Sequence, residues 1–286
     1  MKIHSQHLCF GGTQYYCQHS SIATGTAMNF SVFLPYQARI QELPALYYLP
    51  SLNCTEETFM IKAGAQRIAA ELGMILVSSD TSPRGLAFPS ESDHRDLGVG
   101  AGFYLDATKE PWAKHYRMGS YINLELPTYI EKHFPACNKY RGIFGHSMGG
   151  HGALVTALRN PDRWHSVSAF APICNPSQVP WGEKAFTNYL GDNQLHWQDW
   201  DASLLLAKSA YPGDILIDQG LDDEFLQREL RPDALEKAAV TSHRKLNLRR
   251  HLGYGHDYYF IQSFIDDHLQ HHARQLQRSV KACVGR

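Results

Sequence analysis

The sequence lacks an excess of charge of either sign, because 27 Lys and Arg residues face 28 Asp and Glu residues among 286 positions. A nucleic-acid partner is therefore not expected, since neutralising phosphates requires clustered basic side chains. Long apolar runs are also missing: stretches such as residues 74–77 end after a few residues, whereas a membrane span needs about 20. The first residues contain no apolar segment of the kind that secretory signals carry. These absences predict a cytoplasmic protein that binds neither nucleic acid nor membrane.

Cysteine is sparse, and none of the six cysteines lies in a C-x-x-C pair. A chain of this size does not need disulfides for stability, so reduced thiols are expected. Sixteen histidines are present, but no H-E-x-x-H or comparable ligand spacing occurs, so neither a metal nor another cofactor is predicted. His271 and His272 follow each other in a polar segment and are expected to be solvated rather than ligating.

What the sequence does contain is a regular alternation of short apolar runs and helical patterns. This alternation predicts an α/β protein with a mostly parallel central sheet and helices on both faces. Strands are predicted at residues 30–34, 45–49, 74–78, 142–144, 166–170, 214–217 and 245–249, and helices at 63–72, 120–132, 148–159, 232–239 and 258–272. No linker or repeat divides the chain, which predicts one domain over residues 1–275 and a disordered tail over 276–286.

Two long segments have little periodicity and many aromatic residues. Residues 79–113 are rich in Pro, Gly and Asp, and long loops in compact domains are usually functional or disordered. Residues 172–200 contain Trp181 among several other aromatic side chains. This second segment is interpreted either as a lid over a pocket or as a small satellite core beneath a surface loop.

The clearest chemical signal is G-H-S-M-G at residues 145–149, which matches the G-x-S-x-G pattern. A predicted strand ends just before it, and a predicted helix begins just after it. In this strand, turn and helix arrangement a serine is held exposed at the carboxyl edge of a sheet, and the glycines permit the tight backbone path. Ser147 is therefore the predicted nucleophile.

A serine nucleophile needs a base and an acid, which follow it along the chain in the order acid, then histidine. His256 lies in a turn between the last predicted strand and the last predicted helix, where the base belongs, and His251 is the fallback. The strand at 214–217 leads into a loop that contains Asp222 and Asp223. Spacing alone does not choose between these two aspartates, and either could instead cap a helix.

The oxyanion of the reaction needs two backbone N–H donors, one of them from the residue after the serine. Met148 is that residue, and the second donor is expected from the loop at residues 50–55, which follows an earlier predicted strand. Cys54 lies on this loop. No acid and base are spaced around it, so it is interpreted as a polarizable residue lining the site rather than as a second nucleophile.

Taken together, the motifs resemble those of the S-formylglutathione hydrolase family, also called esterase D. The matching stretches are C-F-G-G at 9–12, L-N-C-T-E-E-T-F at 52–59, K-A-G-A-Q-R at 62–67, D-T-S-P-R-G at 80–85, G-F-Y at 102–104, G-H-S-M-G-G-H-G at 145–152, P-W-G-E-K-A-F at 180–186, I-D-Q-G-L-D-D-E-F-L at 217–226 and Y-Y-F at 258–260. The resemblance implies an α/β-hydrolase fold and hydrolysis of S-formylglutathione to glutathione and formate through a formyl-serine intermediate.

The resemblance also implies roles for individual residues. It places the nucleophile on Ser147, the base on His256 and the acid on Asp223, and it places the oxyanion donors on Leu52 and Met148. Cys54 would be the pocket cysteine. Where the family usually has Ser-Gly-Leu-Thr-Cys-Thr, this chain has P-S-L-N-C-T at 50–55, and the base is followed by aspartate instead of serine.

Glutathione carries two carboxylates, so a cationic groove is expected near the serine. Candidate pocket residues are Cys54, Lys62, Arg84, Trp181 and Lys184. If the chain assembles, a homodimer is the expected form. Two other interpretations compete with thioester hydrolysis: a general short-chain carboxylesterase that uses the same triad, and a non-catalytic binding protein built on a hydrolase fold.

Overall fold

The computed structural model describes residues 1–86, 88 and 91–284. The strands are β1 Lys2–Cys9, β2 Gly12–Ser20, β3 Ala27–Leu34, β4 Leu43–Leu49, β5 Ile75–Ser79, β6 Ala136–His146, β7 Ser166–Phe170, β8 Ile215–Gly220 and β9 Leu246–His251. The α-helices are α1 Glu56–Lys62, α2 Gln66–Leu72, α3 Met118–Ser120, α4 Leu126–His133, α5 Met148–Arg159, α6 Pro180–Leu190, α7 Gln194–Trp197, α8 Ala202–Lys208, α9 Pro232–Thr241 and α10 Tyr258–Val284. Short 3-10 helices are η1 Tyr36–Arg39, η3 Pro176–Gln178 and η4 Gln198–Trp200, and two π-helical turns are η2 Tyr121–Glu125 and η5 Leu226–Leu230.

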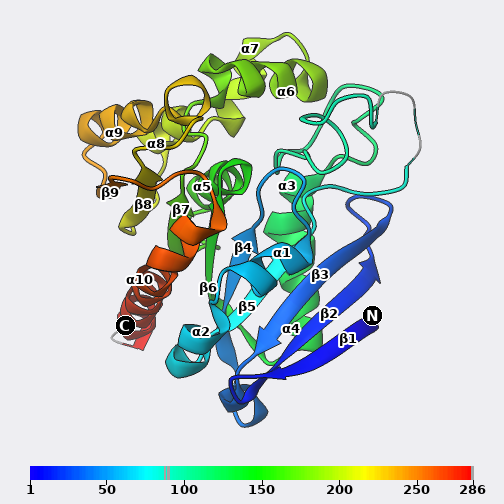
Figure 1. The fold of residues 1–286 in the computed structure, drawn as a ribbon, viewed down its shortest axis with the longest axis vertical. Coiled ribbons are helices and arrows are strands. Elements are labelled where there is room, and N and C mark those ends of the chain that lie inside the picture. Colours follow the sequence, from blue (N-terminus) through cyan, green and yellow to red (C-terminus); the bar gives the residue numbers. More distant parts are fainter. Residues whose placement is uncertain (87, 89–90, 285–286) are drawn as a thin grey trace.

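All nine strands form one sheet in the order β1-β2-β3-β5-β4-β6-β7-β8-β9 (Figure 1). From β5 to β9 every neighbouring pair is parallel, whereas β1, β2, β3 and β5 are joined by antiparallel pairing. The predicted α/β class with a mostly parallel central sheet is therefore confirmed. The carboxyl ends of the parallel strands meet at one edge, where α/β proteins place their sites.

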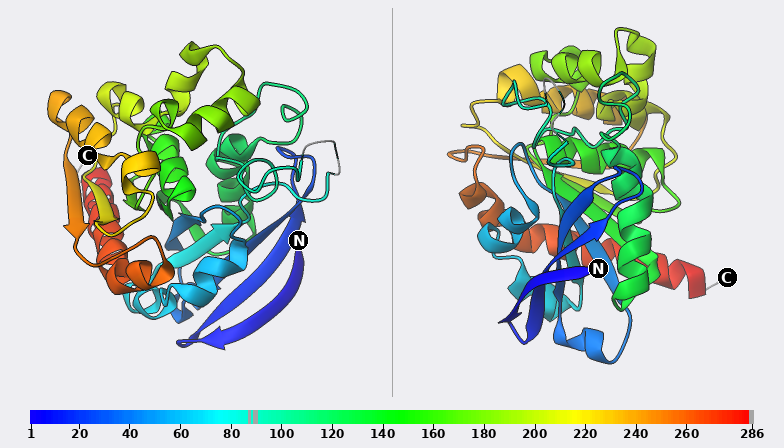
Figure 2. Two further views of the ribbon diagram at one scale, coloured as in Figure 1. Left: turned by 45° about the horizontal axis from the view of Figure 1, so that its top comes forward. Right: turned by 90° about the vertical axis from the view of Figure 1, so that its right-hand side faces the viewer.

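Sequence analysis did not predict β1 and β2, which extend one edge of the sheet as an antiparallel ribbon (Figure 2). Phe10 and Gly11 connect them in a two-residue turn, and both have a positive φ, as tight hairpin turns require. Most residues of β1 are exposed, so its sequence carries little of the apolar alternation by which strands are recognised.

Helices cover both faces of the sheet, as predicted (Figures 1 and 2). Two consecutive core residues of β4 pack on opposite faces of the sheet. Tyr48 stacks on Phe59 of α1 with ring centroids 3.8 Å apart, whereas Tyr47 meets Trp164 edge-on at 5.3 Å. Adjacent strand residues point to opposite faces. α1, α2 and α10 therefore share one face, where α10 packs against α2, and α5 and α8 lie on the other.

The helix predicted at 63–72 corresponds to α2, which begins only at Gln66, and α1 before it was not predicted; Gly64 with φ +68° separates the two helices. The last helix is longer than predicted. α10 continues to Val284, and Leu276 is buried in the core, where the sequence predicted the start of a disordered tail. Within the described part of the chain, no helix is both long enough and apolar enough to cross a membrane.

The prediction that His271 and His272 are solvated is wrong, because both side chains are buried on α10. His272 Nδ1 lies 2.7 Å from Ser166 Oγ, and His271 Nε2 lies 3.2 Å from the carbonyl oxygen of Val167. The polar residues around them misled the sequence analysis. One face of α10 is polar but turned inward, where hydroxyls and carbonyls of β7 satisfy the imidazoles.

Two irregular segments lie beyond the carboxyl ends of the strands (Figure 1). The described residues of the first segment, 80–86, 88 and 91–117, wind across this end, and α6 and α7 lie next to them. Tyr189 of α6 joins the two segments, since its hydroxyl donates to the carbonyl of Ala101 at 2.8 Å and accepts from the N–H of Gly98 at 2.8 Å. The long segments that the sequence singled out therefore cover the edge of the sheet at which Ser147 lies.

Candidate active site

Ser147 occupies a sharp turn between β6, which ends at His146, and α5, which begins at Met148. Its backbone has φ 58° and ψ −118°, a conformation that a serine adopts only when the surroundings enforce it. Gly149 makes the turn possible, because a Cβ at that position would collide with the carbonyl oxygen of Leu49. The side chain of Ser147 therefore projects from the carboxyl edge of the sheet at the start of a helix.

His256 lies on the loop after β9 and is held by Asp223 from the loop after β8. His256 Nδ1 and Asp223 Oδ2 are 2.6 Å apart. Asp223 is itself fixed, since Gln219 Nε2 donates to Oδ2 at 3.2 Å and the N–H of Phe225 donates to Oδ1 at 2.9 Å. A carboxylate can only accept, so Nδ1 of His256 carries the proton and Nε2 is left free to accept another.

Asp222 and Asp223, between which spacing did not choose, differ in burial and contacts. Asp222 is exposed, whereas Asp223 is buried and lies beside His256. His251, the fallback base, lies 3.2 Å from the buried carboxylate of Asp218 instead. Asp257, which follows the base, accepts N–H hydrogen bonds from Tyr259 and Phe260 and so caps α10.

The imidazole of His256 is packed between two aromatic side chains. Phe225 meets it edge-on with ring centroids 5.0 Å apart, and the ring of His146 lies 4.4 Å away at 42°. Burial, and to a smaller extent the neighbouring His256, holds the pKa of His146 well below its ordinary value. The base therefore has a neutral partner on this side, and its orientation is set by Asp223 together with these rings.

A second Ser–His–Asp arrangement exists in the core. His268 Nδ1 lies 2.8 Å from Ser168 Oγ, and His268 Nε2 lies 3.2 Å from Asp218 Oδ2. All three side chains are fully buried, and Ser168 is in the middle of β7. No substrate reaches this set, so only the arrangement at Ser147 combines the residue types with access.

The loop at residues 50–55 lies beside Ser147 and has a defined path. Asn53 adopts φ +59°, a conformation that asparagine tolerates, and its N–H donates to the carbonyl of Gly100 at 2.9 Å. The N–H of Cys54 donates to the carbonyl of Ser51 at 3.1 Å, and Tyr104 Oη donates to the carbonyl of Pro50 at 2.7 Å. Replacement of the family's usual glycine by Ser51 has therefore left an ordered loop.

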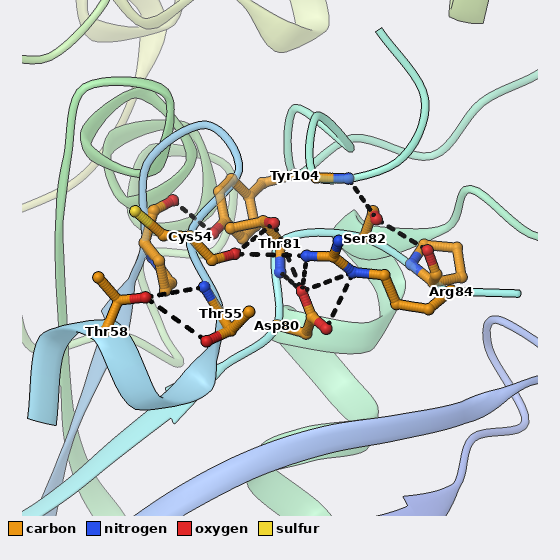
Figure 3. A network of polar contacts seen from close by, with 11 residues as sticks. Cys54, Thr55, Thr58, Asp80, Thr81, Ser82, Arg84 and Tyr104 are labelled. Atoms are coloured by element: carbon orange, nitrogen blue, oxygen red, sulfur yellow. Dashed lines mark hydrogen bonds and ion pairs between the residues drawn. The ribbon is translucent and has the colours of Figure 1, made fainter. Parts of the chain in front are cut away.

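Asp80 and Arg84 support this loop from behind, as Figure 3 shows. Thr81 Oγ1 donates to the carbonyl of Cys54 at 2.9 Å, and Arg84 Nη2 donates to the same oxygen at 3.5 Å. Asp80 fixes the guanidinium, with Oδ1 2.6 Å from Arg84 Nη2. The arginine that the sequence placed in the substrate pocket is thus part of the scaffold under the loop.

A cavity of about 310 Å³ opens at the serine. Ser147, His256, Leu52 and Trp181 line it together with Ser51, Asp96, Ile173, Phe225, Arg228, Glu229 and Leu230. Its size lies at the lower end of the range for sites that bind small molecules. The structure therefore brings Ser147, His256 and the loop at residues 50–55 to one accessible cavity.

Of the five predicted pocket residues, only Trp181 lines this cavity among the residues described. Lys184 lies at its edge, 2.6 Å from Asp96, and Lys62 lies near the ring of Tyr258. Cys54 does not line the cavity, and burial raises the pKa of its thiol despite hydrogen bonds with Thr58 and Tyr258. A cationic residue can be recognised in a sequence, but its ion-pair partner cannot. The partner decides in which direction the cationic side chain points.

Sequence analysis missed three charged residues of the cavity: Asp96, Arg228 and Glu229. Arg228 and Glu229 belong to the π-helical turn η5, which follows the loop of the catalytic acid. Their only sequence signal is closeness to Asp223. π-Helical turns are frequent at functional sites, but no simple residue pattern predicts them.

Comparisons with known proteins show the family to which the chain belongs. Residues 21–271 match the family model described as "Putative esterase". An S-formylglutathione hydrolase from Rattus norvegicus is 49% identical over 278 residues, covering 96% of this chain and 99% of the relative. One from Paracoccus denitrificans is 48% identical over 272 residues, covering 95% and 97%. The solved structure of an S-formylglutathione hydrolase from Agrobacterium tumefaciens superposes with a TM-score of 0.94 at 47% identity, covering 96% of this chain and all of that one.

Proposed function

The chain belongs to the S-formylglutathione hydrolase family of esterases, and from this premise we propose that it hydrolyses S-formylglutathione to glutathione and formate. The observation that carries the proposal is the 2.6 Å contact between His256 and Asp223 beside a serine held at a strained turn. A buried carboxylate, an imidazole and a hydroxyl that lines the same cavity as the imidazole are the groups that acyl transfer needs. Conservation of the fold at a TM-score of 0.94 supports the same reaction.

In the proposed mechanism, Nε2 of His256 takes the hydroxyl proton of Ser147 as Oγ attacks the formyl carbon. The tetrahedral intermediate collapses, the carbon–sulfur bond breaks, and His256 returns the proton to the thiolate of glutathione. Water then attacks the formyl carbon with the same histidine as base. The bond from that carbon to Ser147 Oγ breaks, His256 returns the proton to Oγ, and formate leaves. Asp223 keeps His256 in the required tautomer and stabilises the imidazolium that forms.

We propose the N–H groups of Leu52 and Met148 as the oxyanion donors. Met148 is the first residue of α5, so its N–H has no acceptor within the helix, and the helix dipole favours negative charge there. Leu52 lines the cavity, and within the described residues no backbone carbonyl accepts from its N–H. Two such donors stabilise the charge that develops on the formyl oxygen.

The decisive experiment compares kcat/KM of the purified protein for S-formylglutathione and for a short aryl acetate, with Ser147→Ala as the blank. A large preference for the thioester that is lost in the variant is the expected result. Equal or faster cleavage of the aryl ester would identify a general carboxylesterase that uses the same triad. Turnover that survives unchanged in Ser147→Ala would reject this serine as the nucleophile.

The hydrogen bond from Thr81 to the loop at residues 50–55 can be tested by mutation. Thr81→Val keeps the shape of a fully buried side chain but removes the hydroxyl that donates to Cys54. We expect kcat to fall about tenfold, because a displaced oxyanion donor loses transition-state stabilisation. The free energy of unfolding should fall by about 1 kcal/mol. Thr128→Val, which removes an exposed hydroxyl bonded to Leu124 on α4, is the control; equal kinetics of the two variants would contradict the supporting role.

Location and assembly are proposals of the same kind. We propose a cytoplasmic protein, in keeping with five described cysteines that are all free thiols, and a homodimer as its assembled form. Sedimentation velocity over a range of concentrations tests the assembly. A single monomeric species throughout would refute the dimer.

A further inference from the structure

One wall of the active-site cavity is charged, although most of the lining is apolar. It contains Asp96, Arg228 and Glu229, and Arg228 is the only cation among the described residues that line the cavity. The cationic residues expected from the sequence are engaged elsewhere, with Arg84 beneath the oxyanion loop and Lys184 paired to Asp96. Arg228 is therefore the candidate partner for a carboxylate that enters this cavity.

Arg228 contacts a buried carboxylate of the cavity wall, although its own side chain is mostly exposed. Its Nε lies 3.3 Å from Glu229 Oε1, and the other carboxylate oxygen of Glu229 accepts the N–H of Trp181 at 3.0 Å. The indole N–H of Trp181 donates to the carbonyl of Asp96 at 2.7 Å. Glu229 is mostly buried, with a side chain that is 11% exposed, so it forms a fixed support between Trp181 and Arg228.

The contact with Glu229 uses one edge of the guanidinium only. The side chain of Arg228 is 76% exposed, and in the described part of the chain no side chain or carbonyl engages its two terminal nitrogens. A guanidinium held by Nε presents the remaining N–H groups as a planar fork, and this fork matches a carboxylate in two parallel hydrogen bonds. The π-helical turn η5 places Arg228, Glu229 and Leu230 in succession along the cavity.

We propose that Arg228, oriented by Glu229, binds a carboxylate of the peptide thiol and thereby selects the leaving group. This proposal rests on the proposed function, because it names the part of the substrate that the same cavity recognises. The formyl group carries no charge and is small, so it offers little binding energy. The thiol half carries the carboxylates, so the discrimination between thioesters must come from contacts such as this one.

The test measures kcat and KM of Arg228→Gln with S-formylglutathione and with a neutral aryl acetate. We expect KM for the thioester to rise at least tenfold while kcat stays within twofold, because the lost contact exists in ground state and transition state alike. Cleavage of the aryl acetate should not change. Arg228→Lys should recover part of the loss, since it restores the charge without the fork.

Two further variants sharpen the result. Glu229→Gln keeps an acceptor for the N–H of Trp181 but removes the charge that orients Arg228, so its KM should lie between wild type and Arg228→Gln. Arg250→Gln removes an exposed arginine paired with Glu236 away from the cavity and should behave as wild type. Salt should weaken thioester binding in the wild type and much less in Arg228→Gln.

The outcomes separate this inference from the proposed function. An equal loss on both substrates would show that Arg228 only shapes the wall, and an unchanged KM would show that it binds no carboxylate; either result overturns the inference and leaves the hydrolase intact. A wild-type protein that does not hydrolyse S-formylglutathione overturns both.

Discussion

Asp223→Asn is expected to lower kcat by about 10⁴ while leaving the fold intact. An amide at this position would donate to Nδ1 of His256 and stabilise the wrong tautomer, so Nε2 would carry a proton and could not accept one from Ser147. The amide oxygen in the place of Oδ1 keeps the hydrogen bond from the N–H of Phe225, whereas the amide nitrogen in the place of Oδ2 no longer accepts from Gln219 Nε2. Only this one additional hydrogen bond is lost, so the free energy of unfolding should fall by about 1 kcal/mol and the main effect should appear in kcat.

Asp222→Asn is the matched control, because it changes the neighbouring aspartate in the same chemical way. Asp222 is exposed, and its N–H, which the substitution keeps, donates to the carbonyl of Tyr254 at 3.0 Å. We expect kcat within twofold of wild type. If Asp222→Asn abolished activity and Asp223→Asn did not, the assignment of the acid would be wrong.

The contrast between these aspartates marks what a sequence can predict about a site. The turn around Ser147 was recognisable because its backbone demands small residues at fixed positions, and the order of strand, loop and helix placed His256. The two aspartates differ by one step along a loop. Burial of one of them depends on how η5 and the loop after β9 pack, which no local pattern encodes.

Charged pocket residues were harder to predict for a related reason. Arg84 and Lys184 are cations on the correct side of the sheet, but Asp80 and Asp96 hold them in the scaffold and at the cavity edge. The role of a long charged side chain is decided by its partners, and these come from distant parts of the chain. Strands are easier to predict, because a buried parallel strand is recognisable from its own run of apolar residues. The bounds of β7 match the prediction for this reason.

Histidine placement is the largest gap between sequence and structure, and it has a thermodynamic consequence. Burial lowers the pKa of His151 to about 3 and that of His271 to about 4, and it holds the pKa values of His146 and His272 well below the ordinary one. Each of these rings is neutral in the folded protein. In the unfolded chain each would titrate near 6.5.

The direction of the pH effect follows from these shifts. Because the folded pKa lies below the unfolded one, the unfolded chain binds more protons whenever the pH lies between the two values. Stability is therefore complete above about pH 6.5 and falls by about 1.4 kcal/mol per pH unit for each such histidine as the pH is lowered. For His151, whose folded pKa is about 3, lowering the pH from 6.5 to 4.5 would cost about 2–3 kcal/mol, a large share of the stability of a domain, and the other three act in the same direction.

We therefore expect urea unfolding to show a steep loss of stability between pH 6.5 and 4.5, and His151→Leu to reduce the slope. His151 is fully buried, both of its ring nitrogens lack a partner among the described residues, and its ring lies 5.5 Å from Phe103, so an apolar side chain suits the site. Removing the titration should recover about 2–3 kcal/mol at pH 4.5 relative to pH 7. Replacing the exposed His4 by Gln is the control. A histidine that is neutral in the folded protein takes up a proton when the chain unfolds at low pH, so its removal must change how the free energy of unfolding depends on pH. If this dependence were the same in His151→Leu and wild type, His151 would not contribute to the acid instability.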